Sequence, residues 1–308
     1  MTIHYLTNKE INRQQWNAII TADPTGLPYA QSWYLDATTH GQWDALITDD
    51  YQLLMPLPWN RIVPGIPQVF APLLSQQLGL FGQSVSDRIL LDFIQAIPTR
   101  FKRVKLPLHR NLSQVKLPGQ IESFREKKNL ILNLHQSYEN IHSNYHKSLR
   151  KRIRAATNRS TITKGGEVMD VFHFYKQHLS SKIKLPDSEW QFVADILDTI
   201  CKKMETLILE VRNAEGERTG MGLFLITPQR VINLFGASSE QGKKDFSMHL
   251  MLDAVIQQYA GQPLHFDFEG SDILGIYNFF KSFGSIEANI SVYERNNLPW
   301  IMKKVIGN

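Results

Sequence analysis

Cysteine is almost absent from this sequence, since Cys201 is the only one among 308 residues. A single cysteine excludes an internal disulfide framework and any zinc site built from several cysteines. Long hydrophobic runs are also missing, because the longest, such as 89–97 and 221–226, fall far short of the roughly 20 apolar residues that cross a bilayer. The N-terminal segment has no basic patch followed by an apolar run, which is the pattern of an export signal. We therefore expect no transmembrane segment and a cytoplasmic protein.

The composition is that of an ordinary folded protein. Hydrophobic residues make up 43% of the chain and charged residues 20%, and the 18 glycines and 14 prolines are spread out rather than clustered. This composition excludes collagen, a coiled coil and a disordered chain. A length of 308 residues is long for one hydrophobic core and suits two lobes of about 150 residues each.

Positive charge is concentrated in one segment of the chain. The formal net charge is +5, and residues 141–166 carry seven Lys and Arg side chains with no Asp or Glu. Subtracting these seven charges from +5 leaves −2 for the rest of the chain. The basic character therefore belongs to one local element rather than to the whole protein.

The basic segment has the pattern of an amphipathic helix over residues 143–158. Leu149, Ile153 and Ala156 recur at spacings of four and three, as the buried face of a helix requires. Another side of this helix carries a ridge of cations that can meet phosphate or carboxylate groups, namely Lys147, Arg150, Lys151 and Arg154. A solvated helix face explains the same residues equally well, but the absence of counter-charges favours a negatively charged partner.

The same order of elements is expected in both halves of the chain: helices first, then three antiparallel strands, then a helix, a strand and a final strand. In the first half, the pattern predicts helices at 7–22, 31–39 and 86–97 and strands at 43–47, 52–58, 68–73, 104–108 and 130–134. In the second half, it predicts helices at 143–158, 168–179, 187–204, 246–259 and 272–283 and strands at 206–212, 220–226, 230–235, 264–268 and 286–293.

This repeated order predicts an α+β fold of two tandem lobes, each a mostly antiparallel mixed sheet flanked by helices. We place the first lobe at residues 1–136 and the second at 137–308. The last stretch of about 15 residues is a candidate for packing on the first lobe.

The densest chemistry lies in the strand and turn at residues 265–271. Strand alternation places Asp267 and Glu269 on one face and Phe266 and Phe268 on the other. We expect the phenylalanines to anchor in the core and the two carboxylates to line an accessible hollow beside the basic helix. Two neighbouring carboxylates influence each other, and a raised pKa of one of them suits proton transfer. A purely structural role, in which the acids cap or pair, is the open alternative.

The residues that follow complete a candidate site. Gly270 allows a tight turn, and Ser271 can cap the next helix, whose first backbone amides can hold an anion. Tyr277 lies within that helix and is a candidate proton donor. The loop at 236–244 combines Ser238 and Ser239 with lysines ahead of a helix, a pattern that can also present amides to phosphate.

Other chemistries have weaker support in the sequence. The loop at 236–244 has the glycine spacing of neither a P-loop nor a dinucleotide-binding site, so we favour an ordinary flexible loop there over a phosphate site. His142 and His146 are four residues apart, but no zinc motif surrounds them. We therefore expect no metal site.

The residues at 265–272 and at 276–284, HFDFEGSD and IYNFFKSFG, resemble the final motif of the FemABX-like acyltransferases, whose chains contain two tandem GNAT-type lobes. The stretch 149–156 is similar to the arginine-rich stretch that opens the second lobe in that family. In the first lobe, residues 55–58 and 75–79 look like those of an uncharacterised bacterial branch with the same layout.

This resemblance implies an N-acyltransferase that uses no metal and passes an acyl or aminoacyl group to an amine acceptor. The donor stays open among acyl-CoA, acyl carrier protein and aminoacyl-tRNA, so a carrier protein or tRNA is an expected partner. Asp267 or Glu269 would take or position the amine, and Tyr277 would protonate the leaving group. Arg150 and Arg154 would hold the donor's phosphate.

Two readings without catalysis stay open. One is an RNA-binding or membrane-surface protein that uses the basic helix at 146–159, since binding driven by phosphate charge needs only such a ridge. The other is a degenerate acyltransferase fold that serves as a partner-binding scaffold.

Overall fold

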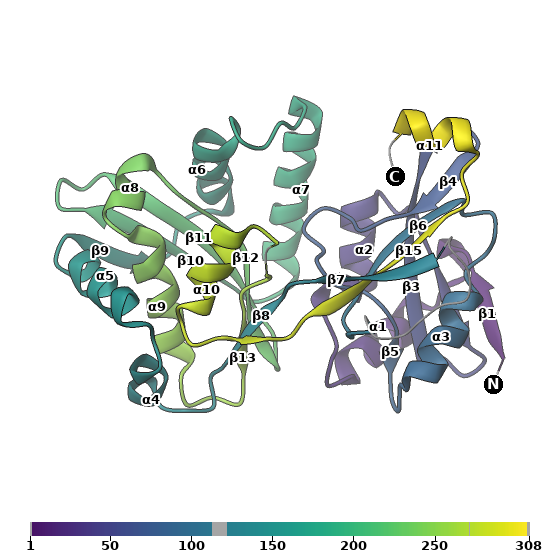
Figure 1. Ribbon diagram of the computed structural model, residues 1–308, viewed down its shortest axis with the longest axis horizontal. Helices are drawn as coiled ribbons and strands as arrows, with labels where there is room; N and C mark the ends of the chain where they lie inside the picture. The colour runs from purple at the N-terminus through teal and green to yellow at the C-terminus, as the bar shows by residue number, and fades with distance from the viewer. Residues whose placement is uncertain (1, 113–121, 271, 307–308) are drawn as a thin grey trace. The chain divides into compact units, whose positions relative to one another are not determined.

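A computed structural model describes residues 2–112, 122–270 and 272–306 of the chain. The chain forms two compact units (Figure 1). The first contains residues 1–127 and 289–308, and the second contains residues 128–288. The expected α+β fold of two lobes, each a mostly antiparallel mixed sheet flanked by helices, is confirmed.

The first unit is built on an eight-stranded sheet with the order β1-β2-β3-β4-β6-β15-β7, and β5 pairs with β3. Only β4 and β6 pair in parallel within this sheet as described. The strands are β1 (Ile3–Leu6), β2 (Trp43–Thr48), β3 (Leu53–Val63), β4 (Ile66–Val69), β5 (Phe81–Gly82), β6 (Arg103–Leu108), β7 (Glu122–Lys127) and β15 (Ile290–Asn296). The helices are α1 (Arg13–Ala22), α2 (Ser32–Thr39), α3 (Asp87–Gln95) and α11 (Trp300–Ile306).

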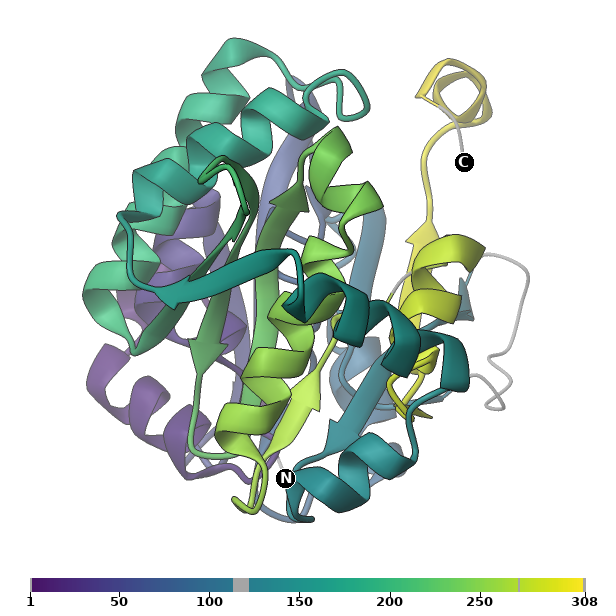
Figure 2. The same cartoon turned by 90° about the vertical axis from the view of Figure 1, so that its left-hand side faces the viewer.

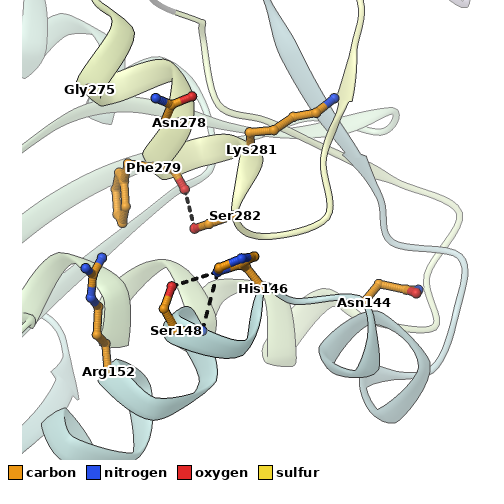
Figure 3. A pocket seen from close by; sticks show the side chains of 9 residues that line it. All are labelled: Asn144, His146, Ser148, Arg152, Gly275, Asn278, Phe279, Lys281 and Ser282. Atoms are coloured by element: carbon orange, nitrogen blue, oxygen red, sulfur yellow. Dashed lines mark hydrogen bonds between the residues drawn. The ribbon is translucent and has the colours of Figure 1, made fainter.

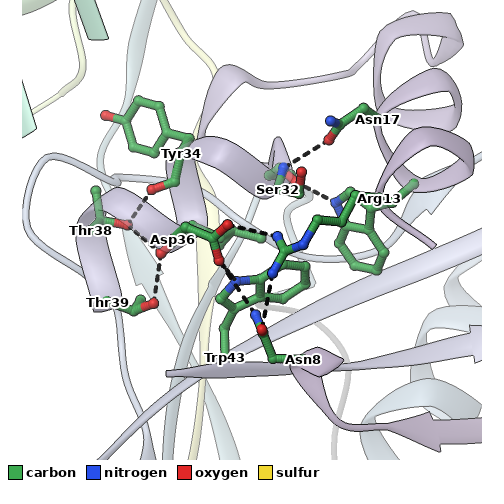
Figure 4. A network of polar contacts seen from close by, with 12 residues as sticks. Asn8, Arg13, Asn17, Ser32, Tyr34, Asp36, Thr38, Thr39 and Trp43 are labelled. Carbon is green, nitrogen blue, oxygen red and sulfur yellow. Dashed lines mark hydrogen bonds and ion pairs between the residues drawn. The ribbon is translucent and has the colours of Figure 1, made fainter. Parts of the chain in front are cut away.

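A polar network joins α1, α2 and β2 in the first unit (Figure 4). The Asp36 carboxylate accepts hydrogen bonds from the indole Nε1 of Trp43 and from Arg13, both at 2.7 Å. The guanidinium of Arg13 also lies over the Trp43 ring, 5.4 Å from its centroid. Because Trp43 is fully buried, this carboxylate satisfies a donor that would otherwise be unpaired at the edge of the core.

The second unit is built on a seven-stranded sheet with the order β14-β8-β13-β12-β11-β10-β9, in which β12 and β13 run parallel. The strands are β8 (Leu130–Asn133), β9 (Ser160–Lys164), β10 (Thr206–Asn213), β11 (Arg218–Ile226), β12 (Arg230–Ser238), β13 (His265–Asp267) and β14 (Ile286–Glu287). The helices are α4 (Tyr138–Ser143), α5 (Lys147–Thr157), α6 (Val168–Leu179), α7 (Asp187–Lys203), α8 (Glu240–Lys244), α9 (Ser247–Tyr259) and α10 (Leu274–Lys281).

Helices cover both faces of the second sheet. The helix α5 runs alongside α9 (Figure 2), and its buried face is the stripe that the sequence predicts, Leu149, Ile153 and Ala156. This stripe joins the core that α9 forms over β10 and β11. On the opposite face α6 packs against β12, where the ring of Tyr175 stacks on Phe235 at 3.8 Å.

The boundary between the two units differs from the expected one. The strand β8, expected to close the first lobe, lies between β13 and β14 in the second sheet. The expected strand at 286–293 is two strands, and only β14 stays in the second sheet, while β15 pairs with β6 and β7 in the first. Alternation shows which side chains a strand buries but not which sheet receives it. The division therefore falls after Lys127 rather than after residue 136.

Candidate active site

Asp267 is buried inside the second unit and does not line an open hollow. It is the last residue of β13 and is only 1% exposed. Its Oδ2 accepts a hydrogen bond from Nη1 of Arg230 at 3.0 Å, across the parallel pair of β12 and β13. Its Oδ1 accepts the backbone N–H of Glu269 at 2.9 Å. The expectation that this acid lines an accessible hollow is wrong, because the Arg230 ion pair and the turn enclose both of its oxygens.

Glu269 is sealed in the same turn. It is 8% exposed and has a left-handed backbone with φ of 52°. Burial raises the pKa of its carboxyl well above the ordinary value of 4.5. The raised pKa agrees with the sequence-based hypothesis, but its cause is removal from water rather than repulsion by Asp267. The expectation of an accessible carboxylate is therefore wrong here too.

Gly270 is enclosed within the turn, whereas the helix whose first amides are predicted to hold an anion begins at Leu274. A Cβ on Gly270 would stand 2.2 Å from the carbonyl oxygen of Lys128, so the glycine is required by close packing. The N–H of Gly270 donates to Oδ1 of Asn129 at 2.8 Å, and it therefore has no bond to give a ligand. Ser271 lies outside the described residues.

Tyr277 lies on α10 and donates its hydroxyl hydrogen bond to Glu287 of β14. This bond is the main cause of the raised pKa of the phenol, because losing the proton would bring two negative charges together. Tyr277 and Asp267, which the sequence predicts to act in one site, therefore each form a hydrogen bond with a different partner. Their hydrogen-bond partners, Glu287 and Arg230, belong to different strands.

The predicted cationic ridge divides into two parts. Arg150 donates from Nη1 to the carbonyl oxygen of Ser143 at 2.7 Å and so ties α5 to the end of α4. Lys147, Lys151 and Arg154 are exposed, and none forms an ion pair with a described residue. We call these three residues the α5 cationic surface.

The loop serines have different environments. Ser239 accepts the N–H of Gly242 at 3.0 Å and caps α8, so its hydroxyl has a structural role. Ser238 ends β12, and its Oγ is buried without a hydrogen-bond partner among the described residues. A buried hydroxyl without a partner is a candidate for contact with a ligand.

The cavity that the sequence does not indicate lies between α5 and α10 (Figure 3). It measures about 500 Å³, and its lining contains Arg152 and Lys281 but no acidic residue. The other lining residues are Asn144, His146, Ser148, Gly275, Asn278, Phe279 and Ser282. Arg152 and Lys281 form no ion pair with a described residue, and they lie next to the positive end of a helix dipole, so they favour an anionic ligand.

His146 positions both walls of this cavity. Its backbone N–H donates to the carbonyl oxygen of Ser282 at 2.8 Å, which joins the start of α5 to the end of α10. Its ring Nδ1 contacts the hydroxyl of Ser148 at 2.7 Å, so Nε2 is the nitrogen that can face a ligand. Helical spacing is the signal that would have found this site: Ser148 and Arg152 are four residues apart on α5.

The central strands of the second sheet diverge. The parallel pairing of β12 and β13 ends at Ile232 and Asp267. β12 continues to Ser238, and no described strand pairs with it on that side. Backbone donors and acceptors along such an opening can bind an extended ligand as an added strand does. Among the described residues, no group of three or more His, Cys, Asp or Glu side chains is placed to hold a metal ion.

No family model matches this chain, and no curated protein matches it significantly in sequence. Its structure matches the crystal structure of FemX with a TM-score of 0.69 over 100% of both chains, at 12% identity. The chain has the fold of FemX. The FemABX-like fold that the sequence motifs predict is therefore confirmed.

Two further structures share this fold. The C-terminal domain of a putative lysylphosphatidylglycerol synthetase from Agrobacterium fabrum matches with a TM-score of 0.54 at 10% identity, over 97% of this chain and 95% of that chain. L-PGS from Bacillus licheniformis matches with a TM-score of 0.52 at 12% identity, over 89% of each chain. Within the part of the chain that the structure describes, no helix has both the length and the hydrophobicity of a membrane span.

Proposed function

We propose that this chain is an N-acyltransferase that moves an acyl or aminoacyl group from a phosphate-bearing donor to an amine. The observation that carries the proposal is the cavity between α5 and α10, with two cations and no acid in its lining, in a chain with the fold of FemX. Acyl-CoA, acyl carrier protein and aminoacyl-tRNA all carry phosphate near the acyl group. These donors are cytoplasmic, and we place the protein in the cytoplasm.

The reaction joins the amine nitrogen to the acyl carbonyl carbon and breaks the bond from that carbon to the donor's sulfur or oxygen. The amine must lose a proton, and the carbonyl oxygen gains negative charge on the way. In our proposal Arg152 holds the donor's phosphate and the ammonium group of Lys281 stabilises the charged oxygen. The N–H of Ser148 donates to Nδ1 of His146, so Nε2 carries the ring hydrogen and donates a hydrogen bond to the charged oxygen. The amine reacts as its free base, and its proton passes to the sulfur or oxygen that leaves.

The predicted acids take no part in this scheme. Asp267 and Glu269 are buried, and the first is bound to Arg230. They hold the turn between β13 and α10, and α10 carries Lys281, one of the residues that line the cavity. They act on the site as positioning residues.

A transfer assay with donors of the three classes and a panel of amines tests the proposal. We expect Arg152→Gln and Lys281→Gln each to lower transfer about tenfold or more, because each removes a charge-assisted contact. Lys151→Gln is the matched control, because Lys151 adjoins Arg152 in sequence and does not line the cavity. Transfer that survives both cavity substitutions would contradict the proposal.

The α5 cationic surface supports a second candidate function, binding of RNA or of an anionic membrane surface without catalysis. Lys147, Lys151 and Arg154 are exposed and lack ion pairs with described residues. Such binding weakens steeply with salt. Salt-sensitive binding of tRNA or anionic vesicles that the triple glutamine variant loses, with no acyl transfer, would favour it. Failure of every donor to bind would favour a non-catalytic scaffold.

A further inference from the structure

His249 lies directly behind the wall of the cavity. It is on the first turn of α9, and neither of its ring nitrogens is accessible or has a hydrogen-bond partner among the described residues. The ring of Phe279 meets it edge to face at 4.7 Å, and the ring of Phe246 does the same at 5.3 Å. An imidazole is thus enclosed between two phenyl rings.

This enclosure is costly for a polar side chain. A histidine ring always carries at least one N–H, and a buried donor without a partner costs about 1–3 kcal/mol. Contact with an aromatic face recovers only part of this. A leucine or phenylalanine at this position would avoid the cost, so the enclosed imidazole indicates a partner that arrives with a ligand.

Two residues connect His249 to the cavity. Phe279 lines the cavity, and Figure 3 shows its ring pointing from α10 toward Arg152. Arg152 lines the same cavity and lies over the ring of Phe246 at 5.7 Å. Burial, and secondarily the charge of Arg152, lower the pKa of His249 to about 4. An anion bound to Arg152 would cancel the second effect.

We propose that His249 is a hidden hydrogen-bond donor of the cavity between α5 and α10, and that Phe279 is the gate that covers it. A phosphate group that binds beside Arg152 turns the Phe279 ring aside and accepts a hydrogen bond from the imidazole. The choice of phosphate as the ligand rests on the proposed function, whose donors all carry phosphate. Binding of phosphate to His249 does not itself require acyl transfer.

Inorganic pyrophosphate is the probe, used with the full chain. We expect pyrophosphate to shift the ring carbon and proton signals of His249 in NMR spectra and to raise its pKa. We expect His249→Phe to weaken pyrophosphate binding about tenfold, the effect of losing one hydrogen bond to a charged group. His178→Phe is the matched control, because His178 also contacts a phenylalanine ring, Phe174 at 4.4 Å, but does not line the cavity.

Substitution of the gate gives an independent readout. Phe279→Ala removes the cover, and we expect the pKa of His249 to rise from about 4 toward its ordinary value of 6.5 without any ligand. Pyrophosphate binding should become tighter, because no ring has to be moved. If His249→Phe fails to fold, the wild-type NMR shift and the Phe279→Ala titration still decide the question.

Each outcome has a defined meaning. Loss of pyrophosphate binding in Arg152→Gln, with full binding in His249→Phe and an unmoved His249 signal, would overturn the inference and leave the cavity as an anion site. Absence of pyrophosphate binding in the wild type would also overturn it. A ligand-induced shift of His249 in a protein that transfers no acyl group would uphold the inference and contradict the proposed function.

Discussion

The buried imidazole of His249 makes the stability of the second unit depend on pH. The pKa of His249 is about 4 in the folded chain and 6.5 when burial is removed. Well above pH 6.5 the ring is neutral in both the folded and the unfolded chain, so it does not change the free energy of unfolding. As the pH falls from 6.5 to about 4, the unfolded chain takes up a proton that the folded chain refuses, so the free energy of unfolding decreases.

The size of this decrease follows from the same two values. Each pH unit between them is worth about 1.4 kcal/mol, and the full interval therefore costs about 3 kcal/mol. Between pH 7.5 and pH 5 the expected loss is about 2 kcal/mol relative to His249→Phe, which has no proton to bind. Urea unfolding at several pH values measures this difference in the free energy of unfolding between the wild type and His249→Phe. Hydrogen exchange of the α9 amides shows whether the difference lies in the second unit.

Arg152→Gln provides a second comparison. Because the charge of Arg152 lowers the pKa of His249, its removal should make the pH dependence shallower but not abolish it, since burial is the larger cause. Equal pH dependence in wild type and His249→Phe would refute the reasoning. It would show that the imidazole reaches water in the folded chain.

Three further changes test the sealed turn. Asp267→Ala is expected to cost about 3 kcal/mol in urea unfolding because it leaves the charge of Arg230, whose side chain is only 20% exposed, without its partner. A much smaller loss would show that water replaces the carboxylate at the guanidinium. The pKa of Glu269 in the folded chain is raised above the ordinary value of 4.5, so the free energy of unfolding decreases as the pH rises above 4.5. Glu269→Gln should remove this decrease when unfolding is measured at several pH values. An unchanged pH dependence would place the carboxyl in water. Gly270→Ala puts a Cβ 2.2 Å from a backbone oxygen, and thermal unfolding should show a clear drop in midpoint, whereas an unchanged midpoint would mean that the turn relaxes.

Much of the fold follows from local patterns. The spacing of Leu149, Ile153 and Ala156 predicts the buried face of α5, and the structure buries those residues. Alternation over residues 265–269 predicts that Phe266 and Phe268 enter the core, and both are buried, although Asp267 and Glu269 on the other face are buried as well. Periodicity succeeds here because the side-chain direction of a helix or strand repeats with a fixed period whatever the element packs against.

The sequence by itself determined many of the helices and strands, the buried face of α5 and the resemblance to the FemABX-like fold. The tertiary structure alone decided that β8 and β15 enter the sheets of the opposite halves, that Arg230 seals Asp267, and that Arg152 and Lys281 line one cavity. A period specifies which way a side chain points relative to its own backbone. It does not specify which distant segment, 37 residues away for Arg230 and Asp267, arrives opposite it.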